Sequence, residues 1–443
     1  MGVSKWLTGA SLALALIMPI SVPTAVRAAP PVQEVGWRDL SAWLVSDDSL
    51  PLITVKMGWR GGSAGEAAAQ AGRVKLMARL LNEGAGALPA QAFQQAMADK
   101  AMSFGANANH DEVTATLRCL KAHQTHCFEL LHLALTAPRF DQEAIDRMKA
   151  AQRAAILRSQ QSANAIAADA FRKLAYPNHP YGRAVDGTLQ SLAAIDRAAL
   201  VAQHQSLLAR DNLYIAVVGD MSRAETRRML RDVFAELPAQ SRHAQAAAVT
   251  ATVGPKSRHI DRPGPQTTVT FGHQAIGYQQ PLFFPAFVMN SILGGSGFSS
   301  RLTEAVREER GLAYSVYSYL AIQNNGAMWR GGVASDNKTA QQAVDVIRGE
   351  MRRIAVEGVS AERLAAAKTY MTGAYALRFD SGSKIAGQLL GIQLMGWPMD
   401  YLLTRNQRIN AVTQDDIKRA AALLLADKLL VVSVGGSAVS LAE

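Results

Sequence analysis

The stretch GGSGFSSRLTEAVREERGLAYSVYS, residues 294–318, is the most specific pattern in the sequence. Ser299 or Ser300 can cap the start of a helix, and Gly311 can take the left-handed conformation that commonly ends one. The glycines before these serines fit a turn into the helix. The stretch therefore predicts a short helix over 300–309 followed by a strand.

Two side chains of this stretch fall on either side of the helix–strand junction. Arg307 lies in the last predicted helical turn, and Tyr314 lies three residues into the strand. This geometry allows a guanidinium and a phenol to converge on one cleft. A lone arginine at a helix end can instead simply complement the negative end of the helix dipole.

The two halves of the chain repeat each other. The segment EAIDRMK at 143–149 corresponds to ERLAAAK at 362–368, and LYIAVVG at 213–219 corresponds to LLVVSVG at 429–435. A repeat of more than 200 residues indicates a duplicated domain, because solenoid repeats are far shorter.

We expect two α+β domains, 29–245 and 246–443, joined through the polar, proline-bearing stretch 238–265. Helical periodicity dominates, with short strands between the helices. In the first half, the pattern predicts strands over 52–59, 106–120 and 213–218 and helices over 70–81, 90–101, 125–135, 142–160, 165–174 and 197–208. In the second half, it predicts strands over 267–272 and 429–434, a hairpin over 312–322 and 327–333 turned by Asn325-Gly326, and helices over 285–293, 300–309, 340–356, 361–377, 384–395 and 414–424.

Composition excludes several classes of protein. The chain has 443 residues, of which 49% are hydrophobic and 19% charged, so it is neither disordered nor fibrous. Its net charge of +10 comes from 46 lysines and arginines without a basic block, which favours a solvated surface over nucleic-acid binding. Two cysteines are too few for a disulfide scaffold.

The first 28 residues read as a signal peptide. Lys5 precedes an apolar run over 7–20, and Val26-Arg27-Ala28 fits the small-x-small rule for cleavage. We expect cleavage after Ala28 and a periplasmic or secreted protein; an uncleaved membrane anchor is the alternative. No later stretch reaches about 18 apolar residues, so no further membrane span is expected.

The whole string at 294–318 resembles the C-terminal signature of the M16 family, which includes insulinase, pitrilysin and mitochondrial processing peptidase. The duplication, PNHPYG at 177–182 and VVGD at 217–220 are also similar to that family, so the resemblance covers essentially all of the mature chain. It implies two LuxS/MPP-like domains, each with an antiparallel-rich sheet packed by helices. It also implies that Arg307 and Tyr314 contact the substrate backbone and help stabilise the tetrahedral intermediate.

M16 catalysis needs zinc, bound by His-x-x-Glu-His on a helix of the first domain and by a glutamate roughly 75 residues further on. Aligning the glycines that flank this helix places Lys75 and Arg79 at the histidine positions and Ala78 at the glutamate. Two cations repel a metal ion. No glutamate occurs between 144 and 224, and the family position of the third ligand falls in 154–157, where no oxygen ligand exists. The chain is therefore expected to bind no metal and to have no catalytic residues of its own.

Other patterns could in principle carry chemistry. His110, His123, His126, Cys127 and His132 form the densest group of metal-ligating residue types, but no acidic base is spaced to serve them, which favours a surface or packing role. Cys119 and Cys127 flank one strand-to-helix connection, and the sequence leaves open whether they form a disulfide.

Two serine motifs have simpler interpretations. Ser381-Gly-Ser-Lys384 matches the Ser-x-x-Lys of penicillin-recognising enzymes but lacks its companion motifs, and serine is a common N-cap. The glycines at 294–297 fit neither a nucleophile elbow nor a dinucleotide loop, because Phe298 stands at the position of the elbow's second glycine.

A kept Arg/Tyr pair beside a lost zinc site resembles the non-catalytic half of a heterodimeric M16 peptidase, whose zinc-bearing partner faces the second domain. Such a chain would bind peptide substrate, and the edge strand expected near 107–116 could pair with it. A binding or assembly protein without a proteolytic role and an independent peptidase with an unrecognised metal site are the alternatives.

Overall fold

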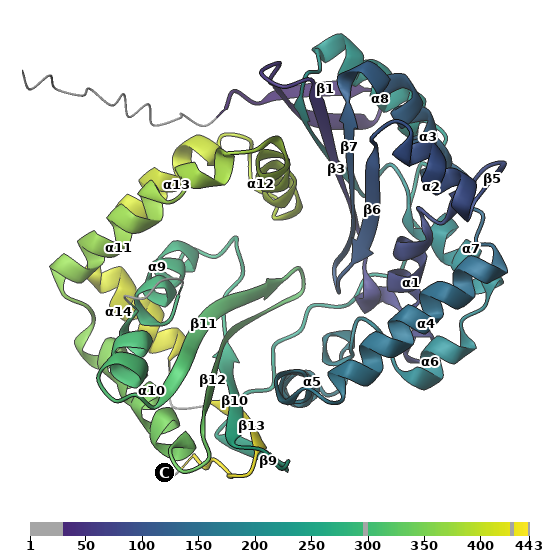
Figure 1. Cartoon of the computed structure of the whole chain (residues 1–443). Coiled ribbons are helices and arrows are strands. Elements are labelled where there is room, and N and C mark those ends of the chain that lie inside the picture. Colours follow the sequence, from purple (N-terminus) through teal and green to yellow (C-terminus); the bar gives the residue numbers. More distant parts are fainter. Residues whose placement is uncertain (1–29, 296–299, 426–428, 442–443) are drawn as a thin grey trace, which may run out of the picture.

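The computed structural model describes residues 30–295, 300–425 and 429–441, and it has an α+β fold in two halves (Figure 1). Each half contains one sheet packed by helices. The expected signal peptide, 1–28, and the expected cap Ser299 lie outside the described residues. Within the described part, no helix combines the length and apolar character needed to cross a bilayer.

The first half is built around a six-stranded sheet with the order β1-β2-β8-β3-β7-β6. A short β4–β5 ribbon lies beside it. The elements are β1 (Gln33–Trp37), β2 (Leu40–Ser46), β3 (Leu52–Arg60), α1 (Arg73–Leu80), β4 (Gly84–Ala85), β5 (Leu88–Pro89), α2 (Ala90–Ala98), β6 (Ser103–Ala108), β7 (Glu112–Leu120), α3 (Gln124–Thr136), α4 (Gln142–Ser159), α5 (Ala163–Ala175), α6 (Leu189–Ala194), α7 (Arg197–Leu207), β8 (Leu213–Gly219) and α8 (Arg223–Phe234).

The second half is built around a five-stranded sheet with the order β11-β12-β10-β13-β9. Its elements are β9 (Lys256–Asp261), β10 (Gln266–Gln274), α9 (Phe283–Leu293), a π-turn (Thr303–Glu308), β11 (Ala313–Gln323), β12 (Gly326–Asp336), α10 (Ala340–Glu357), α11 (Ala361–Gly373), α12 (Gly382–Leu394), α13 (Tyr401–Asn410), α14 (Gln414–Leu424) and β13 (Leu430–Gly435).

The two sheets share one topology, as the sequence repeat predicts. Strands β2-β8-β3-β7-β6 of the first sheet correspond in order to β9-β13-β10-β12-β11 of the second. In both sheets, one pair is parallel, β2 with β8 and β13 with β9, and the other pairs are antiparallel. Within the six-stranded sheet, only β1 has no counterpart among the described strands of the second sheet.

The halves exchange one helix each. Helix α5 of the first half packs on β13 and β10 of the second sheet, and α12 of the second half packs on β8 and β3 of the first (Figure 1). Apolar side chains of α5 share a core with β13, and those of α12 share a core with β2 and β8. The two helices occupy equivalent places in the sequence repeat, so the exchange is reciprocal.

A glycine in each sheet makes room for the exchanged helix. A Cβ on Gly58 of β3 would lie 3.1 Å from Leu390 of α12, and a Cβ on Gly272 of β10 would lie 2.8 Å from Phe171 of α5. Such distances are shorter than ordinary van der Waals contact, so these close approaches depend on glycine. Gly58 and Gly272 occupy equivalent positions in the two sheets. Leu390 and Phe171, which pack against them, are also at equivalent positions of the repeat.

Several expected elements are corrected by the structure. The single strand expected over 106–120 is a hairpin of β6 and β7, because Asn109 Oδ1 accepts hydrogen bonds from the backbone of Asp111 and Glu112 and makes a turn. The turn of the second hairpin consists of Asn324-Asn325, while Gly326 pairs with Gln323 within the ladder. The interdomain stretch 238–265 contains β9, and the sequence pattern did not predict β1, β2, α6, α8 or α13.

Replacing Phe171, which packs against Gly272 of the second sheet, should destabilise the whole chain. Phe171 is fully buried, so Phe171→Ala should lower the free energy of unfolding by about 3–5 kcal/mol through lost burial and a cavity. Urea unfolding followed by far-UV circular dichroism measures this. Leu157→Ala, on the exposed face of α4, is the control; an equal, small effect of both variants would contradict the exchange as a source of stability.

Candidate functional site

The turn that carries Arg307 has the expected ends and an unexpected middle. Ser300 Oγ accepts a hydrogen bond from the backbone of Thr303, as predicted for an N-cap, and Gly311 has a φ of +60°, as predicted for the stop. Between them the predicted short helix is present, but over Thr303–Glu308 it is a π-helix instead of an α-helix. π-turns are uncommon and occur frequently at functional sites.

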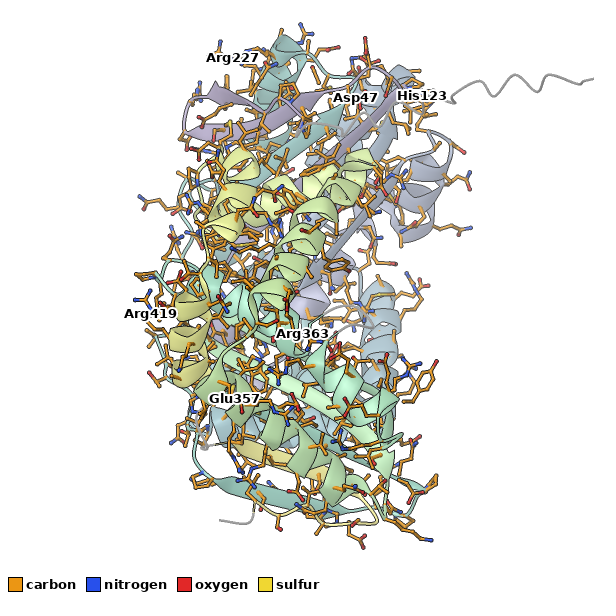
Figure 2. All side chains as sticks on the ribbon, turned by 90° about the vertical axis from the view of Figure 1, so that its left-hand side faces the viewer. Asp47, His123, Arg227, Glu357, Arg363 and Arg419 are labelled. Atoms are coloured by element: carbon orange, nitrogen blue, oxygen red, sulfur yellow. A yellow bond between two sulfur atoms is a disulfide. The ribbon has the colours of Figure 1, made fainter. Side chains whose placement is uncertain are left out.

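Ion pairs hold this turn to the helices behind it. Arg301 Nε lies 2.8 Å from Glu350 of α10, and both side chains are largely buried. Glu304 receives Arg363 of α11 at 2.5 Å, and Arg363 is labelled in Figure 2. The backbone that positions Arg307 is therefore tied to two helices of the second half.

Tyr314 protrudes because β11 is irregular at this point. Ala313 pairs with Ser335 and Val316 pairs with Val333, so Tyr314 and Ser315 together face one residue of β12. Such a bulge redirects side chains. The ring of Tyr314 is 82% exposed.

Arg307 and Tyr314 meet, as the sequence predicts. The guanidinium carbon of Arg307 lies 4.8 Å from the centre of the Tyr314 ring, the geometry of a cation–π contact. The pair thus places a half-buried cationic donor beside an exposed phenolic donor. Both groups can donate hydrogen bonds to a carbonyl or carboxylate oxygen of a second molecule.

The predicted zinc positions lie on α1, in the first half. Lys75 Nζ pairs with Asp186 at 3.2 Å, and Ala78 is fully buried. Arg79, in the last turn of α1, is partly exposed. A lysine held by a carboxylate, an alanine and an arginine supply no ligand for zinc, so the residues present do not fit the metal.

Side-chain hydrogen bonds satisfy the backbone groups at the start of α1. The buried carboxylate of Glu66 accepts the backbone N–H groups of Gly72 and Val74. Burial outweighs these two bonds and raises the pKa of Glu66 to about 7. Gln152 of α4 donates to the carbonyl oxygens of Gly72 and Asp186, which ties α4 and the loop before α6 to this end of the helix.

The segment expected to have lost the third ligand, 154–157, lies in α4. There Ile156 is buried and Leu157 is exposed, and neither side chain carries a ligating atom. Within 30–295, 300–425 and 429–441, no group of three or more His, Cys, Asp or Glu side chains is arranged to hold a metal ion.

Two of the histidines around α3, His110 and His132, are bonded to backbone carbonyls of the protein. His110 Nε2 donates to the carbonyl of Arg183, and burial lowers the pKa of His110, which favours the neutral ring. His132 hydrogen-bonds the carbonyl of Val233 on α8. Cys127 forms a disulfide with Cys119, with a Cα–Cα separation of 6.5 Å, which settles a pairing that the sequence left open.

The serine motif at 381–384 is a helix cap. Ser381 Oγ accepts the backbone N–H of Lys384, and Lys384 Nζ pairs with Asp380 at 2.5 Å. The ammonium group of Lys384 is therefore paired with the surface carboxylate of Asp380. Of the glycines at 294–297, Gly294 and Gly295 donate to the carbonyl of Asn290 at the end of α9, and Gly297 lies outside the described residues.

The edges of the two sheets differ from the sequence expectation in two ways. The expected edge strand near 107–116 is wrong in part, because β7 lies inside the sheet and β6 forms the edge. Tyr317 and Tyr319 of the second edge strand, β11, stack on each other with ring centres 6.2 Å apart. Their spacing of two residues within a predicted strand was a usable signal, since it puts both rings on one face.

Comparison with known families identifies the chain. A family described as insulinase (peptidase family M16) matches residues 44–189, and one described as peptidase M16 inactive domain matches residues 194–371. The chain belongs to the M16 family. Because α1 offers no ligand set, it is a member without the zinc motif.

Relatives of this M16 chain carry different names. The Helicobacter pylori protein named non-peptidase homolog YmxG is 25% identical over 387 residues, which covers 87% of this chain and 89% of the relative. The probable mitochondrial-processing peptidase subunit beta of Schizosaccharomyces pombe is 23% identical over 406 residues, covering 87% and 86%. An uncharacterized zinc protease of Mycobacterium leprae, ML0855, is 28% identical over 261 residues, 58% of each chain.

Solved structures share the fold over nearly the whole chain. A crystal structure described as peptidase M16 inactive domain, from Pseudomonas fluorescens, has a TM-score of 0.86 and 26% identity and covers 92% of this chain and 99% of that one. A protease from Helicobacter pylori has a TM-score of 0.83 at 15% identity, covering 92% and 100%, which shows likeness of fold.

The purified M16 chain should contain no stoichiometric zinc and should cleave no peptide alone. Lys75 and Arg79 repel a divalent cation, and Ala78 cannot act as a base. Elemental analysis of protein purified without chelators, together with a peptide-cleavage assay, tests this. About one zinc per chain, lost on chelation together with activity, would contradict it.

Proposed function

We propose that this chain is the non-catalytic subunit of a heterodimeric M16 zinc metallopeptidase. It binds the peptide substrate and supplies Arg307 and Tyr314 to a zinc-bearing partner chain. The observation that carries the proposal is the contact of the half-buried Arg307 with the exposed Tyr314 on an anchored turn, in a chain whose α1 has no zinc ligands. The name of the Helicobacter pylori relative, a non-peptidase homolog, agrees with a chain that does not cleave peptides itself.

The chemistry of peptide cleavage explains why such a pair would matter. During attack on a peptide bond the carbonyl oxygen gains negative charge. Donors already aimed at that oxygen stabilise the charge without reorganising water. The guanidinium of Arg307 and the phenol of Tyr314 are such donors, and the ring contact between them restricts where each can point.

Two exposed sheet edges can hold an extended peptide. Strand β6 ends the first sheet and β11 ends the second, so each has a side that no neighbouring strand of the described chain pairs. On β11 one residue of that side is already engaged, since the N–H of Ser318 donates to Gly294 and its C=O accepts from Asn290. A peptide can add to such an edge as another strand. Tyr314 lies on β11 itself, which places the donor pair beside one of these edges.

An extracytoplasmic location belongs to the same proposal. The N-terminal sequence has the pattern of a signal peptide, and the Cys119–Cys127 disulfide is a bond that persists in oxidising compartments. N-terminal sequencing of the protein from fractionated cells should find Ala29 as the first residue. A cytoplasmic chain that retains Met1 would contradict this location.

The alternative is a binding or assembly protein without a proteolytic role. The loss of the zinc positions agrees with this function as well. The two functions differ in what Arg307 does: an assembly protein needs no donor aimed at a substrate. The zinc-bearing M16 chain of the same organism, with an intact His-x-x-Glu-His, is the partner to use in the test.

Arg307→Ala and Tyr314→Phe should each lower kcat of the mixed complex by about 10²–10³, because each removes one donor to the developing oxyanion. The partner is mixed with each variant, complex formation is confirmed by size-exclusion chromatography, and kcat and KM are compared. Arg419→Ala is the control, since Arg419 lies on the outer helix α14 and is labelled in Figure 2. Full turnover by both variants in the assembled complex would favour the assembly function.

A further inference from the structure

A cavity of about 310 Å³ lies between the two halves, apart from the Arg307–Tyr314 pair. Helix α5 and the segment after it form one wall, with Arg172, Tyr176 and Tyr181. The β11–β12 hairpin forms the other wall, with Arg330 and Gln323. His110, at the end of β6, closes one side. The volume suits a side chain or a chain terminus rather than a cofactor.

Two arginines share this cavity without a carboxylate between them. Arg330 stacks on Phe171 at 4.7 Å, and its Nε is buried without a hydrogen-bond partner; the same is true of the Nε of Arg172. Among the described residues no carboxylate lies within ion-pair distance of Arg330. Burial lowers the pKa of Arg172, and the positive charge of Arg330 contributes to the same direction. Like charges held together repel, and an anion between them removes that cost.

Tyr176 adds a neutral donor to the same space. Its side chain is only 4% exposed, and its hydroxyl is buried without a partner. Burial raises the pKa of Tyr176 to about 12, so the phenol keeps its proton and can donate. An unpaired buried hydroxyl costs free energy unless a bound group accepts its hydrogen bond.

The acidic residues near the cavity are already engaged. Asp111 accepts hydrogen bonds from the hydroxyl of Tyr181 at 2.6 Å and from the backbone of Asn324 at 3.1 Å. Asp169 pairs with both Arg172 and Lys173, on the exposed side of α5. Neither carboxylate meets the free donors of Arg330 and Tyr176.

We propose that this cavity binds a carboxylate of the peptide substrate, with Arg330, Arg172 and Tyr176 as its donors. The proposal deepens the proposed function, on which it rests, by naming the substrate chemistry. The carboxylate belongs either to an acidic side chain or to the C terminus of the peptide. The planar guanidinium of arginine can donate two parallel hydrogen bonds to either kind of carboxylate.

The position of the cavity favours a peptide as the source of the carboxylate. Ala321 and Gln323 line it from β11, the exposed edge of the second sheet, and Tyr319 of the same strand pairs with Arg330 of β12. Tyr317 and Tyr319 continue the same face of β11 as a stacked, half-exposed pair. A peptide lying along this edge passes the aromatic pair and reaches the arginines.

Binding to the mature chain alone tests the proposal. The probes are fluorescein-labelled ten-residue peptides of alanine, valine and serine: one with a central glutamate, one with glutamine instead, and each with a free or an amidated C terminus. Fluorescence anisotropy should show at least one carboxylate-bearing form binding about 10-fold or more tightly than the glutamine peptide with an amidated end. The glutamate arm reports a side-chain carboxylate, and the amidation arm reports the C terminus.

The preference should disappear in Arg330→Gln and Arg172→Gln and should weaken in Tyr176→Phe, which removes only a hydroxyl. Arg258→Gln, an exposed arginine on β9 of the same sheet, is the matched control and should keep it. If Arg330→Gln does not fold, as judged by its melting temperature, Arg330→Lys keeps the charge but loses the fork and should reduce the preference. Equal affinity for all four peptides, or a preference that survives in the folded variants, would overturn the proposal.

A separate readout keeps the two proposals apart. If the chain activates its zinc-bearing partner on neutral peptides but binds acidic and neutral peptides equally, the cavity proposal fails and the subunit function stands. If it prefers carboxylates but activates no partner, the subunit function fails and the cavity remains a carboxylate-binding site. Strong competition by inorganic phosphate without any preference among peptides would instead show a general anion site and overturn the proposal.

Discussion

The reciprocal exchange of α5 and α12 is the constraint on which the rest of the structure depends. Each helix covers the other half's sheet, and equivalent glycines, Gly58 and Gly272, let Leu390 and Phe171 approach the strands. Neither sheet could stay buried if the halves separated, because each would expose the apolar face that the other half's helix covers. Buried contacts therefore fix the position of one half relative to the other, and the connecting segment is not needed to do so.

This placement creates the surfaces between the halves. The C-terminal end of α5 brings Arg172 and Tyr176 to the β11–β12 hairpin, and the tip of that hairpin is held by Asp111 from the β6–β7 turn. The hydroxyl of Tyr181 bonds both Asp111 and the backbone of Asn325, so one phenol joins three segments of the chain. The cavity and the two exposed strand edges thus follow from the helix exchange, because no single half contains both walls.

The sequence predicts the long helices and the buried strands, whose periodicity reflects burial on one face or on both. It fails where structure depends on partners distant in the chain. Strand β9, KSRHID, has no apolar pattern and exists because its backbone pairs with β13. The π-turn and the bulge at Tyr314 depend on register, which local propensity does not encode. Helix α8 is a different case, since its start could have been predicted from the capping box of Ser222 and Glu225 in the sequence.

For the site, the contact between Arg307 and Tyr314 was predictable from the sequence. The Arg172–Arg330 cavity was not, because its walls come from opposite halves.

The surroundings of α1 and of Tyr314 differ in physical character. Around α1, the residues at the zinc positions are part of the fold: Lys75 pairs with Asp186, and Ala78 is fully buried. Around Tyr314 the opposite holds, since the ring is almost fully exposed and its backbone is irregular on both sides of Gly311. An exposed ring on an irregular backbone adds little to the free energy of unfolding, and buried ion pairs such as Arg301–Glu350 fix its support. Stability therefore accounts for Lys75 and Ala78 on α1 but not for the exposed ring of Tyr314, which agrees with the proposed contact of this ring with a second molecule.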